Sequence, residues 1–294
     1  MPELQTLRPH EKDLGGGFIV RRSLPSSLRQ AIGPFVFFDH FGPTTVAPDS
    51  NFDVRPHPHI GLATVTYLFE GAMMHRDSTG KVQRIEPGAI NLMTAGRGIV
   101  HSERAPDDLR GTSYRNHGLQ LWLAVPPEHE EDAPGFQHVP AAEIPAREVD
   151  GVDVRVLIGS AFGMTSPVQP VSPTLYVNFN FVADSADAAI TVPDAAEERA
   201  LYSTDAAIEL DGQSIPAYTM VVLEPGTQPR LRAPRGAHVV LVGGAPLGHR
   251  FMVWNFVSSR KERIVQAQDD WEAQRFERVP GDDKEFIPLP PRHA

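Results

Sequence analysis

Two short pairs of residues carry side chains that could hold a metal ion. His57 and His59 are separated by one residue in RPHPH, and His101 and Glu103 by one residue in VHSER. Side chains two positions apart on a β-strand point to the same face, so each pair projects two ligands into one space if its segment is a strand. Two such pairs on neighbouring strands bring three imidazoles and one carboxylate together.

The four residues are more specific as a set than either pair is alone. With 12 His in 294 residues, an H-x-H pair arises by chance about half the time. His59 and His101 lie 42 positions apart, which allows several strands before the chain returns beside the first pair. Gly96 and Gly98 precede the second pair and suit a tight entry with close backbone approach. We predict one metal site, with structural histidines on a polar face as the alternative.

The ligand types restrict the metal only to a group. The chain contains no Cys, so nitrogen and oxygen must bind the metal. Three imidazoles and a carboxylate suit Fe(II), Mn(II), Cu(II), Ni(II), Co(II) and Zn(II), and the affinity order alone does not choose among them. In a six-coordinate site, four protein ligands leave two positions for a chelating oxygen substrate and O2, which favours redox chemistry over a closed structural site.

Strands must position these ligands, and the sequence indicates many of them. The 28 Pro and 24 Gly separate short segments rich in β-branched and aromatic residues, which predicts an all-β fold. The triplet Glu86-Pro87-Gly88 returns as Glu224-Pro225-Gly226, a weak internal repeat that fits a type II turn. The clearest strand segments are 17–21, 63–69, 119–125, 175–181 and 238–242.

The length of 294 residues predicts two domains. We place an N-terminal metal-binding domain at 1–135 and a C-terminal domain at 136–294, with the Pro-rich, acidic segment 126–150 as the connection. The second half contains no H-x-H or H-x-E motif, and His238 stands alone there, so we expect the C-terminal domain to be metal-free.

A helix is predicted near the C-terminus. Residues 259–262 read Ser-Arg-Lys-Glu, a capping-box sequence. Ile264, Ala267 and Trp271 then recur at helical spacing, so we expect this apolar stripe to dock on a barrel.

Charge and hydropathy exclude two classes of partner. The formal net charge of −10 provides no basic surface for phosphate contacts, so direct nucleic-acid binding is disfavoured. No apolar run approaches the ~18 residues that span a bilayer, and the first residues lack the apolar core of a signal peptide. We therefore expect a cytoplasmic monomer without membrane contact.

Several motifs resemble the pirin family in order and spacing along nearly the whole chain: RPHPHIGLATVTYLFEG, HRDSTG, TAGRGIVHSE, DHFGP, GGAPLG, NFV, DDWEAQRF and the Pro-rich tail. The resemblance implies two tandem cupin (jelly-roll-like) barrels, the first of which holds one metal, usually iron. General cupins take a carboxylate ligand shortly after the H-x-H pair, where this chain has Ala63 and Thr64. The pirin variant supplies it from the later strand, so the implied ligands are His57, His59, His101 and Glu103.

The resemblance also implies function. The first hypothesis is a quercetin 2,3-dioxygenase, which opens an aromatic flavonol with O2 and releases CO, with Glu103 as a ligand or as the catalytic base for the 3-hydroxyl proton. The alternative is a metal- or redox-sensing regulatory protein that binds a transcription factor or a metabolic enzyme. A metal-stabilised protein without activity is a third reading. His75 and His40 are candidates to fix the tautomer of a ligand imidazole or to shape the mouth of the pocket, with turn packing as the alternative for each.

Overall fold

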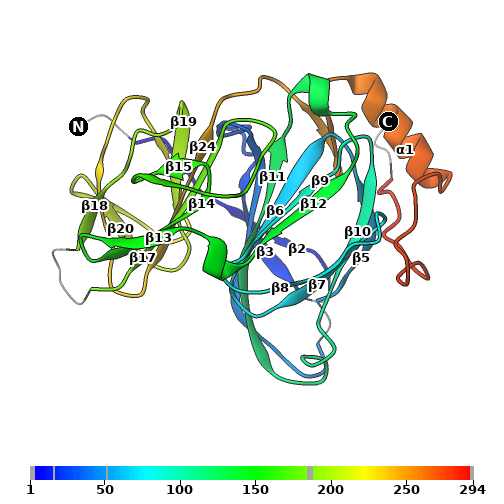
Figure 1. Ribbon diagram of the computed structural model, residues 1–294, viewed down its shortest axis with the longest axis horizontal. Helices are drawn as coiled ribbons and strands as arrows, with labels where there is room; N and C mark the ends of the chain where they lie inside the picture. Colours follow the sequence, from blue (N-terminus) through cyan, green and yellow to red (C-terminus); the bar gives the residue numbers. More distant parts are fainter. Residues whose placement is uncertain (1–3, 16, 51, 184–187, 292–294) are drawn as a thin grey trace. The chain divides into compact units, whose positions relative to one another are not determined.

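β-Strands dominate the structure, and one helix follows them near the C-terminus (Figure 1). The computed structural model describes residues 4–15, 17–50, 52–183 and 188–291. All five strand segments expected from the sequence overlap observed strands, and the all-β prediction with a C-terminal helix is confirmed. Among the described residues, no helix is both long enough and apolar enough to cross a bilayer.

The chain divides into two compact units, each assembled from three segments. Unit 1 comprises Met1–Lys12, Arg21–His40 and Val139–Pro246, and unit 2 comprises Asp13–Val20, Phe41–His138 and Leu247–Ala294. The C-terminal helix, which the sequence assigns to a domain 136–294, therefore belongs to unit 2 together with the predicted ligand strands. The domain boundary after residue 135 stays a prediction.

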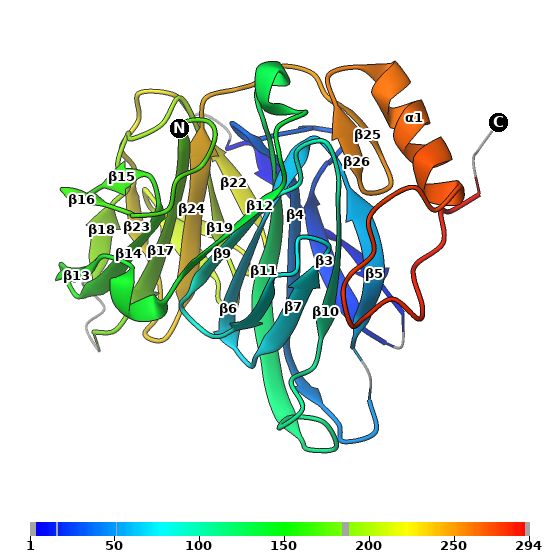
Figure 2. The same cartoon turned by 45° about the vertical axis from the view of Figure 1, so that its right-hand side comes forward.

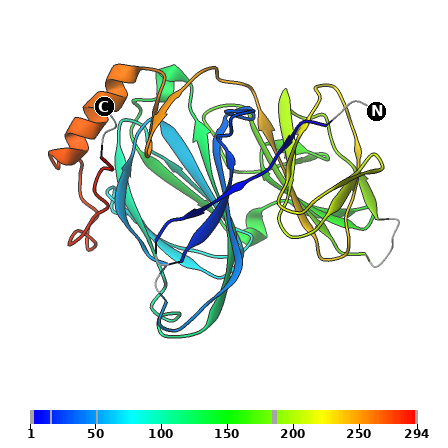
Figure 3. The same cartoon turned by 180° about the vertical axis from the view of Figure 1, so that it is seen from behind.

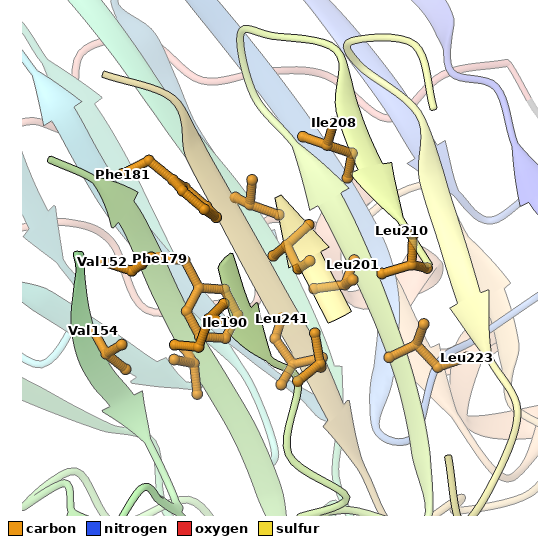
Figure 4. Packing of buried hydrophobic residues seen from close by; sticks show 14 of the residues in the cluster. Val152, Val154, Phe179, Phe181, Ile190, Leu201, Ile208, Leu210, Leu223 and Leu241 are labelled. Atoms are coloured by element: carbon orange, nitrogen blue, oxygen red, sulfur yellow. The ribbon is translucent and has the colours of Figure 1, made fainter. Parts of the chain in front are cut away.

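Unit 1 is built on an apolar core between short strands. In β14 (Val152–Ile158), Val152, Val154 and Val156 are fully buried while the polar residues between them are partly exposed, which is the period of two expected for a strand. Figure 4 shows side chains of this core converging from several strands.

A seven-stranded sheet makes up the larger part of unit 1. In spatial order it runs β1 (Thr6–Leu7), β22 (Met220–Leu223), β19 (Glu198–Ser203), β24 (His238–Gly244), β17 (Thr174–Phe181), β14, β13 (Ala146–Val149). A four-stranded sheet runs β18 (Ala189–Thr191), β23 (Arg230–Arg232), β20 (Ile208–Leu210), β21 (Gln213–Ile215), and β15 (Ser160–Ala161) pairs with β16 (Met164–Thr165).

Unit 2 contains the sheet that carries the predicted ligands. This four-stranded sheet runs β5 (Val54–His59), β10 (Ile99–Arg104), β7 (Met73–Asp77), β8 (Val82–Ile85). A seven-stranded sheet, some of whose strands continue into unit 1, runs β12 (Gly135–Val139), β9 (Ile90–Thr94), β6 (Leu62–Glu70), β11 (Tyr114–Ala124), β4 (Phe35–Val46), β3 (Ile19–Leu24), β2 (His10–Asp13). β25 (Phe251–Val253) pairs with β26 (Phe256–Ser258).

The repeated Glu-Pro-Gly triplets form the turns that the sequence predicts. Gly88 and Gly226 have φ of 78° and 76°. The carbonyl of Glu86 accepts a hydrogen bond from the amide of Ala89, and that of Glu224 accepts one from Thr227, each at 3.3 Å. Both triplets thus have the hydrogen bond and the left-handed glycine of a type II turn.

Helix α1 (Lys261–Glu272) packs beside β25 and β26 (Figure 2). Its predicted apolar stripe is buried against Ile60 and Phe256, so that prediction is confirmed. After the helix the chain folds back, as the red tail in Figure 3 shows. Trp271 Nε1 donates to the carbonyl of Ile287 at 3.0 Å, and the amide of Ile287 donates to the carbonyl of Pro56 in β5 at 2.9 Å. The tail therefore adds to the outer side of a ligand strand.

The capping box predicted at 259–262 is not formed. The N-cap of α1 is Arg260, and no side chain caps this helix end. The hydroxyls of Ser258 and Ser259 donate instead to the carboxylate of Glu130, at 2.8 and 3.1 Å. The backbone amide of Ser259, which Glu262 would accept in a capping box, donates to the same carboxylate at 2.8 Å.

The segment 126–150 does more than connect the two units. It contains η1 (Pro127–His129), η2 (Ala141–Glu143), β12 and β13. Glu130 within it is 2% exposed and forms an ion pair with Arg250, 4% exposed, at 3.1 Å. The boundary between the units falls at residues 138/139, inside the predicted connection. The first part of this connection, residues 126–138, belongs to unit 2.

Candidate metal centre

The β5-β10-β7 sheet places the predicted ligands on one face. His101 of β10 lies directly opposite His57 of β5. On the other side of β10, Asp77 of β7 lies opposite His101, and His75 lies opposite Glu103. Because side chains alternate along a strand and cross-strand partners share a face, these five side chains project from the same side of the sheet.

Two glycines start the β10 strand in the way the sequence predicts. Gly96 has φ of 51°, and a Cβ there would collide with the carbonyl oxygen of Asp132. A Cβ on Gly98 would lie 2.9 Å from the ring of Phe276. Only glycine allows this backbone to approach its neighbours so closely before it delivers His101 to the site.

Three histidines converge at the centre of this face. One ring nitrogen from each of His57, His59 and His101 lies within 4.8 Å of the others. These side chains are only 7%, 1% and 2% exposed. The Nε2 atoms of His59 and His101 are 3.1 Å apart. The structure thus brings three of the four predicted ligands together.

Backbone carbonyls fix two of the rings. His57 Nδ1 donates to the carbonyl of Arg55 at 2.9 Å, and His59 Nδ1 donates to the carbonyl of Asn255 at 3.1 Å. A carbonyl only accepts, so the proton of each neutral ring sits on Nδ1 and the Nε2 lone pair is free to bind a metal. Asn255 is 196 residues from His59, and nothing in the sequence signals its role.

Burial keeps all three imidazoles neutral. It lowers the pKa of His57 to about 4, although the hydrogen bond to Arg55 opposes the shift. Burial also holds the pKa of His59 and of His101 well below the ordinary value, with the nearby His57 adding to the effect. Neutral imidazole is the form that binds metals, so at neutral pH no proton has to leave these rings.

The donor set fits a divalent metal. Two nitrogens at right angles, each about 2.0–2.1 Å from one ion, are about 3.0 Å apart, close to the observed Nε2 separation. Two unprotonated nitrogens facing each other at 3.1 Å repel unless a proton or cation lies between them. The three histidines therefore suit a metal site better than a purely structural cluster.

Glu103 is not part of the three-histidine group. It lies two residues beyond His101, after an irregularity in the β5–β10 register. Burial raises the pKa of its carboxyl to about 7. Among the described residues none forms a hydrogen bond or an ion pair with its side chain. A desolvated carboxylate without a partner beside His101 suits a metal ligand, and the role of Glu103 as the fourth ligand stays a prediction.

Residues around the histidines complete the site. His75 Nδ1 lies 3.4 Å from His101 Nδ1, so His75 is where a partner of a ligand was expected. The indole of Trp122 meets His59 edge to face at 5.2 Å, a contact that sequence reasoning missed. His40, the other candidate partner, belongs to unit 1, where its Nδ1 lies 3.0 Å from Tyr202 Oη. The role expected for His40 beside the metal site stays a prediction.

Known proteins share this chain's sequence and fold. The family model described as Pirin matches residues 17–123, and the one described as Pirin C-terminal cupin domain matches residues 176–277. A pirin-like protein of Caulobacter vibrioides is 45% identical over 282 residues, which is 95% of this chain and 96% of the relative.

Two solved structures of quercetin 2,3-dioxygenase from Acinetobacter baumannii are also similar. One has a TM-score of 0.89 at 34% identity, covering 99% of this chain and 96% of that one. The other has a TM-score of 0.84 at 25% identity, covering 93% and 97%. The predicted pair of cupin domains is confirmed by these matches.

Proposed function

Since the chain belongs to the pirin family, we propose that it is a metal-dependent dioxygenase of the quercetin 2,3-dioxygenase type. Its substrates are a flavonol and O2. The observation that carries the proposal is the cluster of three buried, neutral histidines whose ring nitrogens converge. The similarity to the two Acinetobacter enzymes supports this reaction over other chemistry that a cupin metal can perform.

The proposed ligands are His57, His59, His101 and Glu103, and the proposed metal is Fe(II). When bound, a divalent metal of this kind supplies a Lewis acid for the flavonol oxyanion and a redox partner for O2. The backbone carbonyls of Arg55 and Asn255 orient two of the ligand rings before any metal arrives. Such pre-orientation lowers the cost of assembling the site.

Glu103 is the proposed catalytic base. Desolvation raises the pKa of its carboxyl to about 7 in the metal-free site, so when it is released from the metal this carboxylate is a stronger base than an exposed one and would take the proton of the flavonol 3-hydroxyl. In the overall reaction two carbon–carbon bonds of the flavonol break and its heterocycle opens. Both atoms of O2 enter the ester product, the carbon that bore the 3-hydroxyl leaves as CO, and the proton returns to the product carboxylate.

A stoichiometric assay tests the proposal. Fe(II)-loaded protein is mixed with quercetin in air, and CO released is measured against flavonol consumed. We expect one CO per flavonol, loss of turnover in His101→Ala and no loss in His238→Ala, a histidine change in unit 1. Turnover no faster than that of free Fe(II), from protein shown to hold the metal, would refute the dioxygenase and leave the regulatory hypothesis.

A further inference from the structure

Asp77, His75 and His101 form a line of buried side-chain contacts that ends at the metal site. Asp77 Oδ2 lies 2.8 Å from His75 Nε2, and His75 Nδ1 lies 3.4 Å from His101 Nδ1. Asp77, His75 and His101 are 0%, 3% and 2% exposed. Phe136 stacks on the ring of His75 at a centroid distance of 4.4 Å, which restricts the plane of that ring.

The order of protons along this line follows from the donors and acceptors. A carboxylate only accepts, so His75 Nε2 must donate to Asp77. With one proton on each ring, His75 Nδ1 is then an acceptor, and the proton in the contact between the two Nδ1 atoms belongs to His101. The Nε2 atom of His101 is thereby left with its lone pair facing His59.

We propose that Asp77, acting through His75, is a positioning residue that sets the tautomer and orientation of His101 for the metal. The proposal rests on the metal centre proposed above. The tautomers of His57 and His59 are set by hydrogen bonds to backbone carbonyls, which no side-chain substitution removes directly. Among the three clustered histidines, His101 is the one whose tautomer is set by side chains. The affinity of the site for metal therefore depends on residue 77.

The turn after β7 fixes which oxygen of Asp77 faces His75. Oδ1 accepts from the Thr79 amide at 2.9 Å, the Thr79 hydroxyl at 2.6 Å and the Lys81 amide at 3.2 Å. Burial alone would raise the pKa of Asp77, but the hydrogen bonds from His75 and Thr79 outweigh it and lower the pKa. Oδ1 is thus held by the turn, and Oδ2 is committed to His75.

Because the two oxygens of Asp77 have different partners, Asp77→Asn should reverse the direction of each hydrogen bond from residue 77 through His75 to His101. The amide oxygen stays at the Oδ1 position to keep its three donors, so the amide nitrogen replaces Oδ2 and becomes a donor. His75 must then accept at Nε2 and carry its proton on Nδ1. His101 becomes the acceptor of that proton, and its own proton moves to Nε2, the atom that should bind the metal.

The first test uses the metal-free protein. Histidine nitrogen chemical shifts in an NMR spectrum distinguish the two tautomers, and the His101 signals are assigned by their loss in His101→Ala. We expect the Nδ1–H tautomer of His101 in the wild type and the Nε2–H tautomer in Asp77→Asn. A wild-type His101 with its proton on Nε2 would overturn the proposal.

The second test measures the affinity for Co(II), a spectroscopic substitute for Fe(II). We expect Asp77→Asn to weaken binding about 10–100-fold, the range typical for partners of metal-binding histidines. Thr79→Val is the matched control, because it removes one hydrogen bond to Oδ1 in the same turn but leaves the line of rings intact. It should bind Co(II) within a few-fold of the wild type.

A double-mutant comparison separates this role from support of the turn. His75→Phe keeps an aromatic ring for Phe136 to stack on but cannot relay a proton. If Asp77 acts through His75, adding Asp77→Asn to His75→Phe changes the Co(II) affinity no further; an equal loss in both backgrounds would overturn the proposal. Wild-type protein that fails to bind Co(II) would also overturn it. Protein that shows this pattern without flavonol turnover would refute the dioxygenase alone.

Discussion

Replacement of His57 by Gln should change how stability depends on pH. The pKa of His57 is about 4 in the folded protein, against 6.5 for the ordinary group. Lowering the pH from 7 to 5 therefore adds a proton to the unfolded chain but not to the folded one, and stability falls. At about 1.4 kcal/mol per pH unit below 6.5, His57 alone removes about 2 kcal/mol of stability by pH 5. The glutamine of the His57→Gln variant does not titrate, so the variant lacks this loss.

Urea unfolding of the metal-free protein at pH 7 and pH 5 measures this difference. All three Trp residues belong to unit 2, so tryptophan fluorescence reports on the unit that contains the site. We expect the stability of the wild type to fall by about 2 kcal/mol more than that of His57→Gln between the two pH values. Equal losses would refute the reasoning, because they would mean that His57 titrates alike in the folded and unfolded chains.

Three further outcomes follow from the packing of unit 2. Glu130→Ala leaves Arg250 buried without its carboxylate and should lower the free energy of unfolding in urea by about 3–5 kcal/mol. The apolar pair Glu130→Leu/Arg250→Met should recover the part of this loss that comes from the unpaired Arg250, but not the hydrogen bonds from Ser258 and Ser259; equal loss in both variants would contradict this. Gly80→Ala, where the added Cβ meets open space, should lower the free energy of unfolding only by the about 1–2 kcal/mol of left-handed backbone strain. Gly96→Ala should lower it by more, because its Cβ also meets the backbone of Asp132; equal losses would rule out this close approach. Metal at 100 times its Kd should stabilise unit 2 by about 2.7 kcal/mol, and a chelator should reverse this; no shift would argue against binding to the folded state.

The sequence predicts the parts of the site that follow from strand periodicity. His57, His59 and His101 could be placed on one face because residues two apart on a strand share a face. The tight entry into β10 could be predicted from Gly96 and Gly98, because only glycine fits there. The sequence also predicts the buried stripe of α1, which follows the helical period.

The rest depends on contacts between distant segments. The carbonyl of Asn255 that orients His59 is a backbone group, so no residue type marks it. The capping box failed because Glu130, far away in the chain, accepts the Ser259 amide that Glu262 would accept in the box. His75 and His40 looked equivalent as candidate partners, and it is the register of β7 against β10 that brings His75 to a ligand.

Co(II) binding to the metal-free protein tests the central claim most directly. Equilibrium titration of the wild type, His59→Ala and His238→Ala gives the number of ions per chain and their affinity. We predict one tightly bound ion per chain in the wild type and in His238→Ala, and loss of tight binding in His59→Ala. Unchanged stoichiometry and affinity in His59→Ala would contradict the assignment of the metal to this histidine cluster.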